Sequence, residues 1–306
     1  MGVLEIKQLN KSFGNHEVLK GMDMEVPENS IFGFVGQNGS GKTTTMKIVL
    51  GLLPASSGEV IVCGEKVTYG ETKTNRNIGY LPDVPEFYGY MNPIEYLKLC
   101  GEITGRSKTQ IREKSEELLS LVGLLDDKKR RIRGFSRGMK QRLGIAQALL
   151  NEPKLLICDE PTSALDPIGR KEILEILLAV KGKTTVVFST HILSDVERIC
   201  DNLAILHNGK LALTGTLAEI KKKHRHNGFL IEFTNKEDLS IIANCEALNT
   251  PEINLTNESN TLTVSISNFD TDGHFLIDLL AQKNIVPVKF EIMEPTLESM
   301  FAEVVK

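Results

Sequence analysis

A glycine-rich segment near the N-terminus has the residue types and spacing that bind phosphate groups. The segment is Gly36-Gln37-Asn38-Gly39-Ser40-Gly41-Lys42-Thr43 and fits the pattern G-x-x-x-x-G-K-[ST]. It lies between an apolar run, Ile31–Val35, and a helical pattern over residues 44–50 that begins with Thr44. Backbone N–H groups freed by the glycines, together with the positive end of the helix, suit the phosphates of a nucleotide. We therefore predict that residues 36–44 bind a nucleoside triphosphate.

Two residues of this segment are expected to do more than hold phosphate oxygens. The Lys42 ammonium should reach the β- and γ-phosphates. The Thr43 hydroxyl should ligate Mg²⁺, which neutralises the charge that develops when the terminal phosphoryl group is transferred. A glycine-rich turn without chemical meaning is the alternative, but the strand before the segment and the helix after it argue against that reading.

A second apolar run, residues 155–158, ends in two carboxylates, Asp159 and Glu160. Ligands of α/β proteins gather at the carboxyl ends of strands, so these side chains are expected beside the phosphates. Asp159 can help to hold Mg²⁺, and Glu160 can polarise a water for attack on the γ-phosphate. Surface charges at an ordinary strand end are the alternative. A phosphate loop with such carboxylates is compatible with a kinase, a GTPase or another ATPase.

Three further segments resemble the motifs of ABC-type ATPases. Phe135-Ser136-Arg137-Gly138-Met139-Lys140-Gln141 resembles their signature motif, L-S-G-G-Q, and Ser163-Ala164-Leu165-Asp166 resembles their D-loop. Ser189-Thr190-His191 is similar to the segment that carries their switch histidine. The order from phosphate loop to signature to acidic strand to histidine is also that of the family. Residues 1 to about 220 thus resemble an ABC transporter ATP-binding subunit.

The resemblance implies that the nucleotide is ATP, bound with Mg²⁺, and that the chain hydrolyses it. It also implies a homodimer in which two copies, head to tail, bury two ATP molecules between them. Ser136, Arg137, Gly138 and Met139 of one copy would then face the γ-phosphate held by the other, and Asp166 is expected to contact nucleotide as well. Ser136 and Gly138 lie just ahead of a helical pattern over residues 139–150, whose positive end suits an anion.

His191 and Phe13 take their expected roles from the same resemblance. His191 would contact the γ-phosphate and keep Glu160 and the attacking water in line. Lys42, Glu160 and His191 are therefore the predicted catalytic residues. Phe13 would stack on adenine, and Val18 would pack beneath it.

The sequence departs from the family pattern at three positions. Asp83 stands where a glutamine that senses Mg²⁺ and the membrane partner is usual, and Arg137 and Met139 stand where the signature usually has glycine and glutamine. Aspartate is charged and one methylene shorter, so we expect Asp83 to reach the metal through a water. The residues needed for hydrolysis are present, and we expect the altered signature to remain active.

An aromatic stretch follows Asp83 in a chain with only 6% aromatic residues. By resemblance, Phe87, Tyr88, Tyr90 and Met91 belong to a groove that grips an integral membrane permease encoded separately, and local core packing is an equally good alternative. The tail over residues 294–301 is similar to the end of ATPases that serve ABC-2-type exporters. The implied function is to power an exporter of drug, antibiotic or peptide type. A soluble ABC ATPase acting on the ribosome or on DNA, and an ATP-binding regulatory or immunity module, are the alternatives.

Composition and charge narrow the choice of partners. Of the 306 residues, 41% are hydrophobic and 25% are charged, as in a globular protein, and the net charge is −4. That balance gives no general attraction to nucleic acid, and no nucleic acid partner is expected. No apolar stretch approaches the ~20 residues of a membrane-spanning helix, and the N-terminus lacks the pattern of a secretory signal. We therefore expect a cytoplasmic protein held on the inner face of the cell membrane through its permease.

The elements that must position these residues alternate in the order of an α/β fold. The clearest buried strands are expected at Ile31–Val35, 155–158 and 184–189, and helices at 111–122 and 168–180, the second opened by Asp166 and Pro167. The fold expected for residues 1–220 is a P-loop NTPase of ABC type, with a mixed or parallel sheet and a helical subdomain over about 88–150.

A second, smaller domain is expected after a basic linker. The linker covers residues 221–228, and an α+β domain covers residues 229–306. Its predicted strands are 229–234, 261–267 and 286–293, and its predicted helices are 272–283 and 296–305. The sequence assigns this domain no role beyond dimer stabilisation or regulation.

Overall fold

The computed structural model describes residues 2–71, 73–223, 228–245, 248, 254–258, 260–265, 269–292 and 296–304. The chain divides into two compact units. The first comprises Met1–Ala218 and Phe301–Lys306, and the second comprises Glu219–Met300. The first unit carries every residue predicted to bind nucleotide.

A six-stranded sheet forms the centre of the first unit, in the order β10-β9-β3-β8-β7-β6. Five strands are parallel, and β10 pairs antiparallel with β9 at one edge. Every residue of β3, β7 and β8 is buried, which explains their unbroken apolar runs, since both faces of the sheet are covered. The strands are β3 Ile31–Val35, β6 Ile78–Leu81, β7 Leu155–Asp159, β8 Thr185–Thr190, β9 Asn202–His207 and β10 Lys210–Thr216. The three buried strands expected from the sequence are confirmed.

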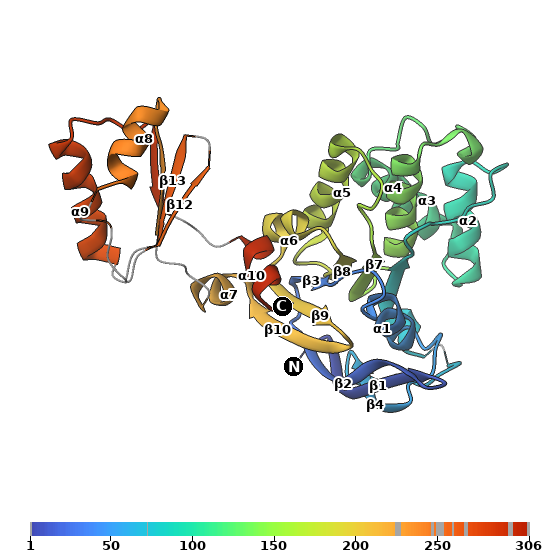
Figure 1. Ribbon diagram of the computed structural model, residues 1–306. Helices are drawn as coiled ribbons and strands as arrows, with labels where there is room; N and C mark the ends of the chain where they lie inside the picture. Colours follow the sequence, from blue (N-terminus) through green and yellow to red (C-terminus); the bar gives the residue numbers. More distant parts are fainter. Residues whose placement is uncertain are drawn as a thin grey trace. The chain divides into compact units, whose positions relative to one another are not determined.

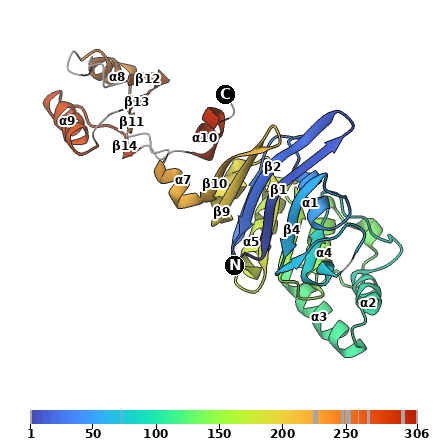
Figure 2. The same cartoon turned by 90° about the horizontal axis from the view of Figure 1, so that it is seen from below.

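An antiparallel sheet that the sequence did not predict lies beside the first one (Figures 1 and 2), in the order β2-β1-β4-β5. Its β1–β2 pairing shifts register repeatedly and includes Gln8 at φ 47°, so the alternation that marks a strand is interrupted. Helix α1, Lys42–Val49, packs its buried face into one core with apolar residues of both sheets. The strands are β1 Leu4–Phe13, β2 His16–Val26, β4 Ser57–Val62 and β5 Glu65–Lys66.

Among the helices that follow α1 in the first unit, α4 and α6 pack on strands of the parallel sheet, and α2, α3 and α4 form the helical part seen in teal to green in Figure 1. Asn92 and Ser107 each form a capping box that begins α2 and α3. Asp166 caps α5 and Pro167 takes its first position, as predicted. These helices are α2 Pro93–Ile103, α3 Lys108–Leu121, α4 Arg137–Leu149, α5 Pro167–Val180 and α6 Leu193–Ile199, with short 3₁₀ turns η1 Thr74–Asn77 and η2 Ile132–Gly134.

The second unit has a β-α-β-β-α-β order, the split βαβ arrangement of ferredoxin-like domains. Its sheet is antiparallel in the order β12-β13-β11-β14, and β11, β13, α8 and α9 supply its buried core. The predicted strands and helices are present, while residues 266–267, 293 and 305 of those predictions lie outside the described residues, as do 224–227 of the expected linker. The elements that follow β10 are α7 Leu217–Lys223, β11 Gly228–Glu232, α8 Lys236–Ala243, β12 Asn254–Glu258, β13 Thr261–Ser265, α9 Phe269–Gln282, β14 Lys289–Ile292 and α10 Leu297–Val304.

Close packing of α4 on β6 depends on Gly79, and a substitution tests it. A Cβ at Gly79 would overlap the carbonyl of Ala148, which is backbone and has no room to move. We expect Gly79→Ala to lower the free energy of unfolding by about 1–3 kcal/mol, measured by urea denaturation. Gly134→Ala is the control, since a Cβ there meets no atom closer than 3.7 Å. Equal stability of the two variants would contradict the packing argument.

Candidate functional site

The segment between β3 and α1 adopts the cradle that the sequence predicts. Gly41 caps α1 with φ 114° and gives no side-chain cap, so the first N–H groups of the helix are left for an external acceptor. A Cβ at Gly36 would lie 2.5 Å from Ser40 Oγ and 2.6 Å from the Leu206 carbonyl oxygen. Between these glycines, residues 37–39 are exposed. The glycines therefore permit a tight turn in which residues 37–39 are exposed to solvent.

Lys42 lies inside this cradle with only 5% of its side chain exposed. Its ammonium donates to the carbonyls of Gly36 at 2.6 Å and Gln37 at 3.3 Å. It also lies 3.3 Å from Glu160 Oε1. The positive charge is thus fixed where phosphate oxygens would approach the loop.

Asp159 and Glu160 are positioned by one residue of the neighbouring strand, Ser189. The Ser189 hydroxyl donates to Asp159 Oδ1 at 2.6 Å. The Glu160 N–H in turn donates to the Ser189 carbonyl and hydroxyl oxygens, at 3.2 and 3.1 Å. Glu160 has φ 48°, a left-handed backbone that non-glycine residues rarely adopt and that concentrates at functional sites. The strand thus ends in a turn that redirects the Glu160 carboxylate.

The structure brings the three predicted catalytic residues together. His191 follows β8, and its Nδ1 lies 2.9 Å from Glu160 Oε2, while Lys42 approaches Oε1 of the same carboxylate. His191 is 46% exposed, whereas Glu160 is 13% exposed. One carboxylate therefore lies between a buried ammonium and an accessible imidazole.

Asp195 is a residue of this region that sequence reasoning missed. It is 4% exposed on α6, four residues after His191. Its carboxylate accepts from Thr162 Oγ1 at 2.8 Å and from Arg170 Nη2 at 2.7 Å. It therefore ties the segment after Glu160 to the helix after His191. An acid on a short helix gives no signal for this role in the sequence.

The site fits the phosphates of a nucleotide. Within the described structure, Ser40 Oγ and Glu160 Oε1 are buried without a hydrogen-bond partner, although the latter contacts the Lys42 ammonium as an ion pair. A cavity of about 210 Å³ adjoins the loop and is lined by four residues of β2, His16, Glu17, Val18 and Lys20, and by His207 and Asn208. Of these, only Val18 was predicted. The side chains of the β9–β10 turn gave no motif by which to find them.

Phe13, at the end of β1, has the exposure that a stacking platform needs. Its ring is 49% exposed, although most phenylalanines are buried. The Lys11 ammonium lies 4.8 Å from the ring centroid, a cation–π contact that covers part of the ring. Stacking on adenine remains a prediction.

The predicted Mg²⁺ ligands form a sparse set. Thr43 is exposed at the start of α1, and Asp159 is 4% exposed with one oxygen bonded by Ser189. In the part of the chain that is described, no three His, Cys, Asp or Glu side chains cluster as a metal cage. One hydroxyl and one carboxylate match Mg²⁺, which is bound by few protein ligands together with water and phosphate. The Asp83 carboxylate pairs with Arg137 at 3.3 Å, and its predicted role toward the metal is not tested.

The signature and D-loop residues lie at two helix N-termini. Ser136 caps α4 by accepting from the Met139 N–H at 3.2 Å, and Asp166 caps α5 by accepting from Gly169 N–H at 3.0 Å. A Cβ on Gly138 would lie 3.9 Å from the Leu165 side chain, so the two termini are neighbours. Both present partial positive charge.

The thiol next to this site is chemically quiet. Cys158 immediately precedes Asp159 and is fully buried, and burial raises the pKa of its thiol well above the usual value. Burial, with a smaller contribution from Asp159, also raises the pKa of the Tyr80 hydroxyl to about 12. Neither group is poised to exchange a proton near neutral pH.

Among the described helices, none is long and apolar enough to span a membrane.

Two family profiles match the chain. Residues 19–163 match the family described as "ABC transporter", and residues 215–305 match "ATP-binding protein DrrA1-3-like, C-terminal domain". An uncharacterized ABC transporter ATP-binding protein, YxlF of Bacillus subtilis, is 44% identical over 76% of this chain and 78% of its own length. The bacitracin transport ATP-binding protein BcrA of Bacillus licheniformis is 39% identical over 73% and 72%. The lantibiotic transport ATP-binding protein SrtF of Streptococcus pyogenes is 39% identical over 69% and 90%.

Solved structures of the same kind share the fold. An ATP-binding subunit of an ABC transporter superposes with a TM-score of 0.66 and 33% identity, covering 72% of this chain and 92% of that one. The ADP conformation of the ATP-binding cassette MJ1267 gives a TM-score of 0.66 at 25% identity, over 72% and 92%.

Substitution of Lys42 tests the cradle directly. Lys42→Ala removes the ammonium and leaves a buried Glu160 oxygen without its cation, so we expect ATP affinity to fall by about 10- to 100-fold. The dissociation constant is measured by calorimetry. Lys47→Ala, an exposed lysine on the same helix, is the matched control and should bind ATP as the unaltered chain does. Equal affinity of the two variants would rule out the assigned role.

Proposed function

The chain belongs to the ABC transporter ATP-binding proteins, and we propose that it hydrolyses ATP with Mg²⁺ to power a separately encoded membrane permease. One observation carries the proposal. The Glu160 carboxylate lies between Lys42 and His191 at the edge of the phosphate loop. A binding module without turnover has no need of a carboxylate held in this way by a strained backbone.

The residues divide the chemistry between them. Glu160 accepts a proton from a water whose oxygen attacks the γ-phosphorus, and the bond to the β-phosphate oxygen breaks. Lys42 balances charge on the phosphates, and His191 holds Glu160 in place. Mg²⁺, held by Thr43 and Asp159, supplies charge neutralisation on the phosphate oxygens.

Two copies are needed for a complete site in this proposal. The N-terminus of α4, with the exposed Ser136, lies beside the D-loop. A second copy placed head to tail would bring its ATP to this terminus, and the arrangement repeated by two-fold symmetry closes both sites. Closure on ATP and reopening after hydrolysis would move the permease.

The aromatic segment after Asp83 is the first part of the proposed permease contact. Tyr88 and Tyr90 are 54% and 65% exposed, with ring centroids 5.8 Å apart. Phe87 instead packs edge-on against Tyr96 at 5.0 Å, so for this residue the core-packing alternative describes its surroundings. Backbone bonds from residues 132 and 133 hold the segment in place, from Ile132 N–H to the Met91 carbonyl and from Arg133 N–H to the Gly89 carbonyl. Exposed, well-anchored tyrosines suit a protein interface.

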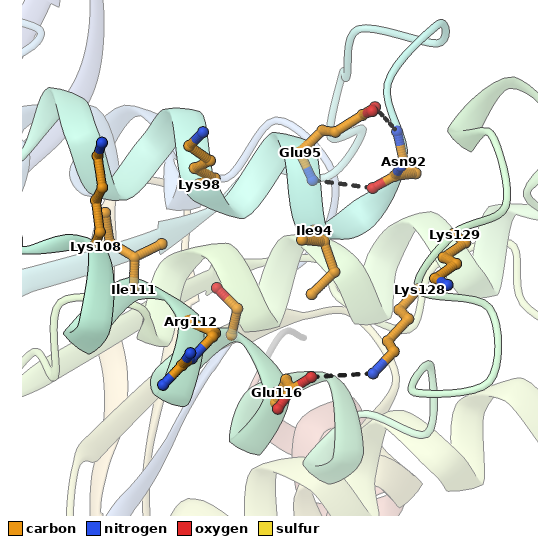
Figure 3. Close-up of a pocket in the computed structure, with 11 residues that line it drawn as sticks. Asn92, Ile94, Glu95, Lys98, Lys108, Ile111, Arg112, Glu116, Lys128 and Lys129 are labelled. Carbon is orange, nitrogen blue, oxygen red and sulfur yellow. Dashed lines mark hydrogen bonds and ion pairs between the residues drawn. The ribbon is translucent and has the colours of Figure 1, made fainter.

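A groove of 740 Å³ between α2 and α3 adjoins this segment and extends the contact (Figure 3). Ile94 and Ile111 form its apolar floor, and the buried Ser115 hydroxyl lacks a hydrogen-bond partner within the described structure. Glu116 is neutralised by Lys128 at 3.0 Å. Three lining cations have no ion-pair partner among the described residues: Lys108, Arg112 and Lys129. The groove therefore suits an amphipathic helix with acidic residues.

The relatives support a proposal for the cargo class and the location. Matches to transport ATPases for bacitracin and a lantibiotic support an exporter of drug, antibiotic or peptide type. The chain would then work in the cytoplasm, on the inner face of the cell membrane, through its permease. The cargo site itself would belong to the permease.

Replacement of the proposed base tests hydrolysis and dimerisation together. Glu160→Gln keeps the size of the side chain but accepts no proton, so ATP turnover should fall by about 100-fold or more. ATP then persists, and the variant should sediment as a dimer in Mg-ATP and as a monomer without nucleotide. Undiminished turnover, or a monomer at saturating Mg-ATP, would refute the proposal.

Charge reversal in the groove tests the permease contact. The tagged chain is purified from detergent-solubilised membranes, where a multi-span membrane protein should accompany it in stoichiometric amount. Lys108→Glu with Arg112→Glu should reduce that amount by about fivefold or more, because like charges across an interface repel. Lys171→Glu, at an exposed position of α5, is the control and should leave it unchanged. Recovery of ribosomes in place of the membrane protein would refute the transport role.

A further inference from the structure

Side-chain contacts that no sequence motif predicts join the loop after β6 to the first turns of α4. Arg137 Nη2 lies 3.3 Å from Asp83 Oδ1. One turn further along the helix, Gln141 Nε2 donates to the Asp83 carbonyl at 2.6 Å, and Gln141 is fully buried. Residues four apart share a helix face, so both contacts lie on the side of α4 that meets the loop.

A third position on the same face brings α4 against the sheet. A Cβ on Gly144 would lie 2.5 Å from Leu81 Cδ1, so the helix lies close to the last residue of β6. Leu81 is in register with Cys158 of β7, and Asp159 and Glu160 follow Cys158. The contacts of α4 therefore tie its N-terminus to the carboxyl ends of β6 and β7, where the proposed catalytic carboxylates lie.

These contacts differ in strength. Gln141 and Gly144 are buried and fix the helix, whereas the Asp83 and Arg137 side chains are 48% and 43% exposed. Exposed ion pairs are weak and are screened by salt. The Asp83 carboxylate and the Arg137 guanidinium can therefore exchange partners while α4 and the loop stay folded. Asp83 and Arg137 line a cleft of 430 Å³. Lys140 lines the same cleft, and the described residues provide it with no ion-pair partner.

Asp83 and Arg137 are also two of the three positions at which the sequence departs from the family motifs, and the structure pairs them with each other. We propose that this pair is a latch within one subunit, which positions the N-terminus of α4 for the ATP of the second copy. Each residue is a positioning residue that works only with the other. The latch rests on the proposed function, because it serves the same two-copy site. It would link the strand ends that carry Asp159 and Glu160 in one subunit to the γ-phosphate of the ATP bound by the second copy.

A double-mutant cycle tests the latch in the Glu160→Gln background, with the ATP-dependent dimerisation constant measured by sedimentation. Asp83→Asn and Arg137→Gln should each weaken dimerisation about fivefold or more, and the reversed pair Asp83→Arg with Arg137→Asp should restore it to within about twofold. Mg-ATP affinity of the monomer should stay within about twofold throughout, and coupling should fade in 0.5 M salt. Lys140→Gln should change nothing.

Failure of the latch and failure of the proposed function give different results. If the Glu160→Gln background forms no dimer in Mg-ATP, the proposed function fails, and hydrogen exchange of the monomer decides the latch. Amides of residues 83–91 and 136–145 should then exchange faster in each single variant and return to the original rate in the reversed pair. Additive effects without rescue would overturn the latch. Loss of Mg-ATP affinity in Asp83→Asn alone would overturn it too, by marking Asp83 as a metal ligand.

Discussion

The proposed role of the Glu160 carboxylate requires that it be held close to phosphate and remain free to accept a proton. Its two oxygens lie 3.3 Å from the Lys42 ammonium and 2.9 Å from His191 Nδ1, and its backbone is fixed by Ser189. Lys42 begins α1, Ser189 lies near the end of β8 and His191 directly follows β8, whereas Glu160 itself follows β7. The rest of the first unit is the scaffold that brings the start of α1, the end of β8 and the turn after β7 together at the carboxyl ends of the parallel strands.

That scaffold depends on packing between two sheets. Helix α1 shares one core with the antiparallel sheet and with β3 of the parallel sheet, and this core fixes the axis along which its N-terminus points. Gly36 and Gly41 allow the chain to turn where side chains would overlap Leu206 and Leu19. Asp195 on α6 also ties the segment after Glu160 and the first turn of α5 to the helix that follows His191. The residues proposed to do the chemistry are thus held in place by contacts from several elements.

The helical part differs in being joined to the sheet edge by contacts of two kinds. Buried contacts at Gln141 and Gly144 hold α4 in place, while the Asp83–Arg137 pair is exposed to solvent. The same part carries the exposed tyrosines and the basic groove. A change at the catalytic edge therefore has a short physical route to the surface proposed for the permease.

The sequence by itself determined the residues proposed to bind phosphate, since glycine spacing, a lysine and a hydroxyl after an apolar strand form a local pattern. It also determined the buried strands and the Asp166 cap of α5, which depend on neighbours in the chain. It did not predict the antiparallel sheet, because bulges such as that at Gln8 break the alternation of β1 and β2. Only the tertiary structure decided that Asp83 meets Arg137, that Asp195 joins Thr162 to Arg170, and that Lys20 and His207 border the phosphate loop. The printed bonds join residues 25 to 54 positions apart, and Lys20 and His207 are 187 positions apart in the chain, so no local pattern encodes these neighbours.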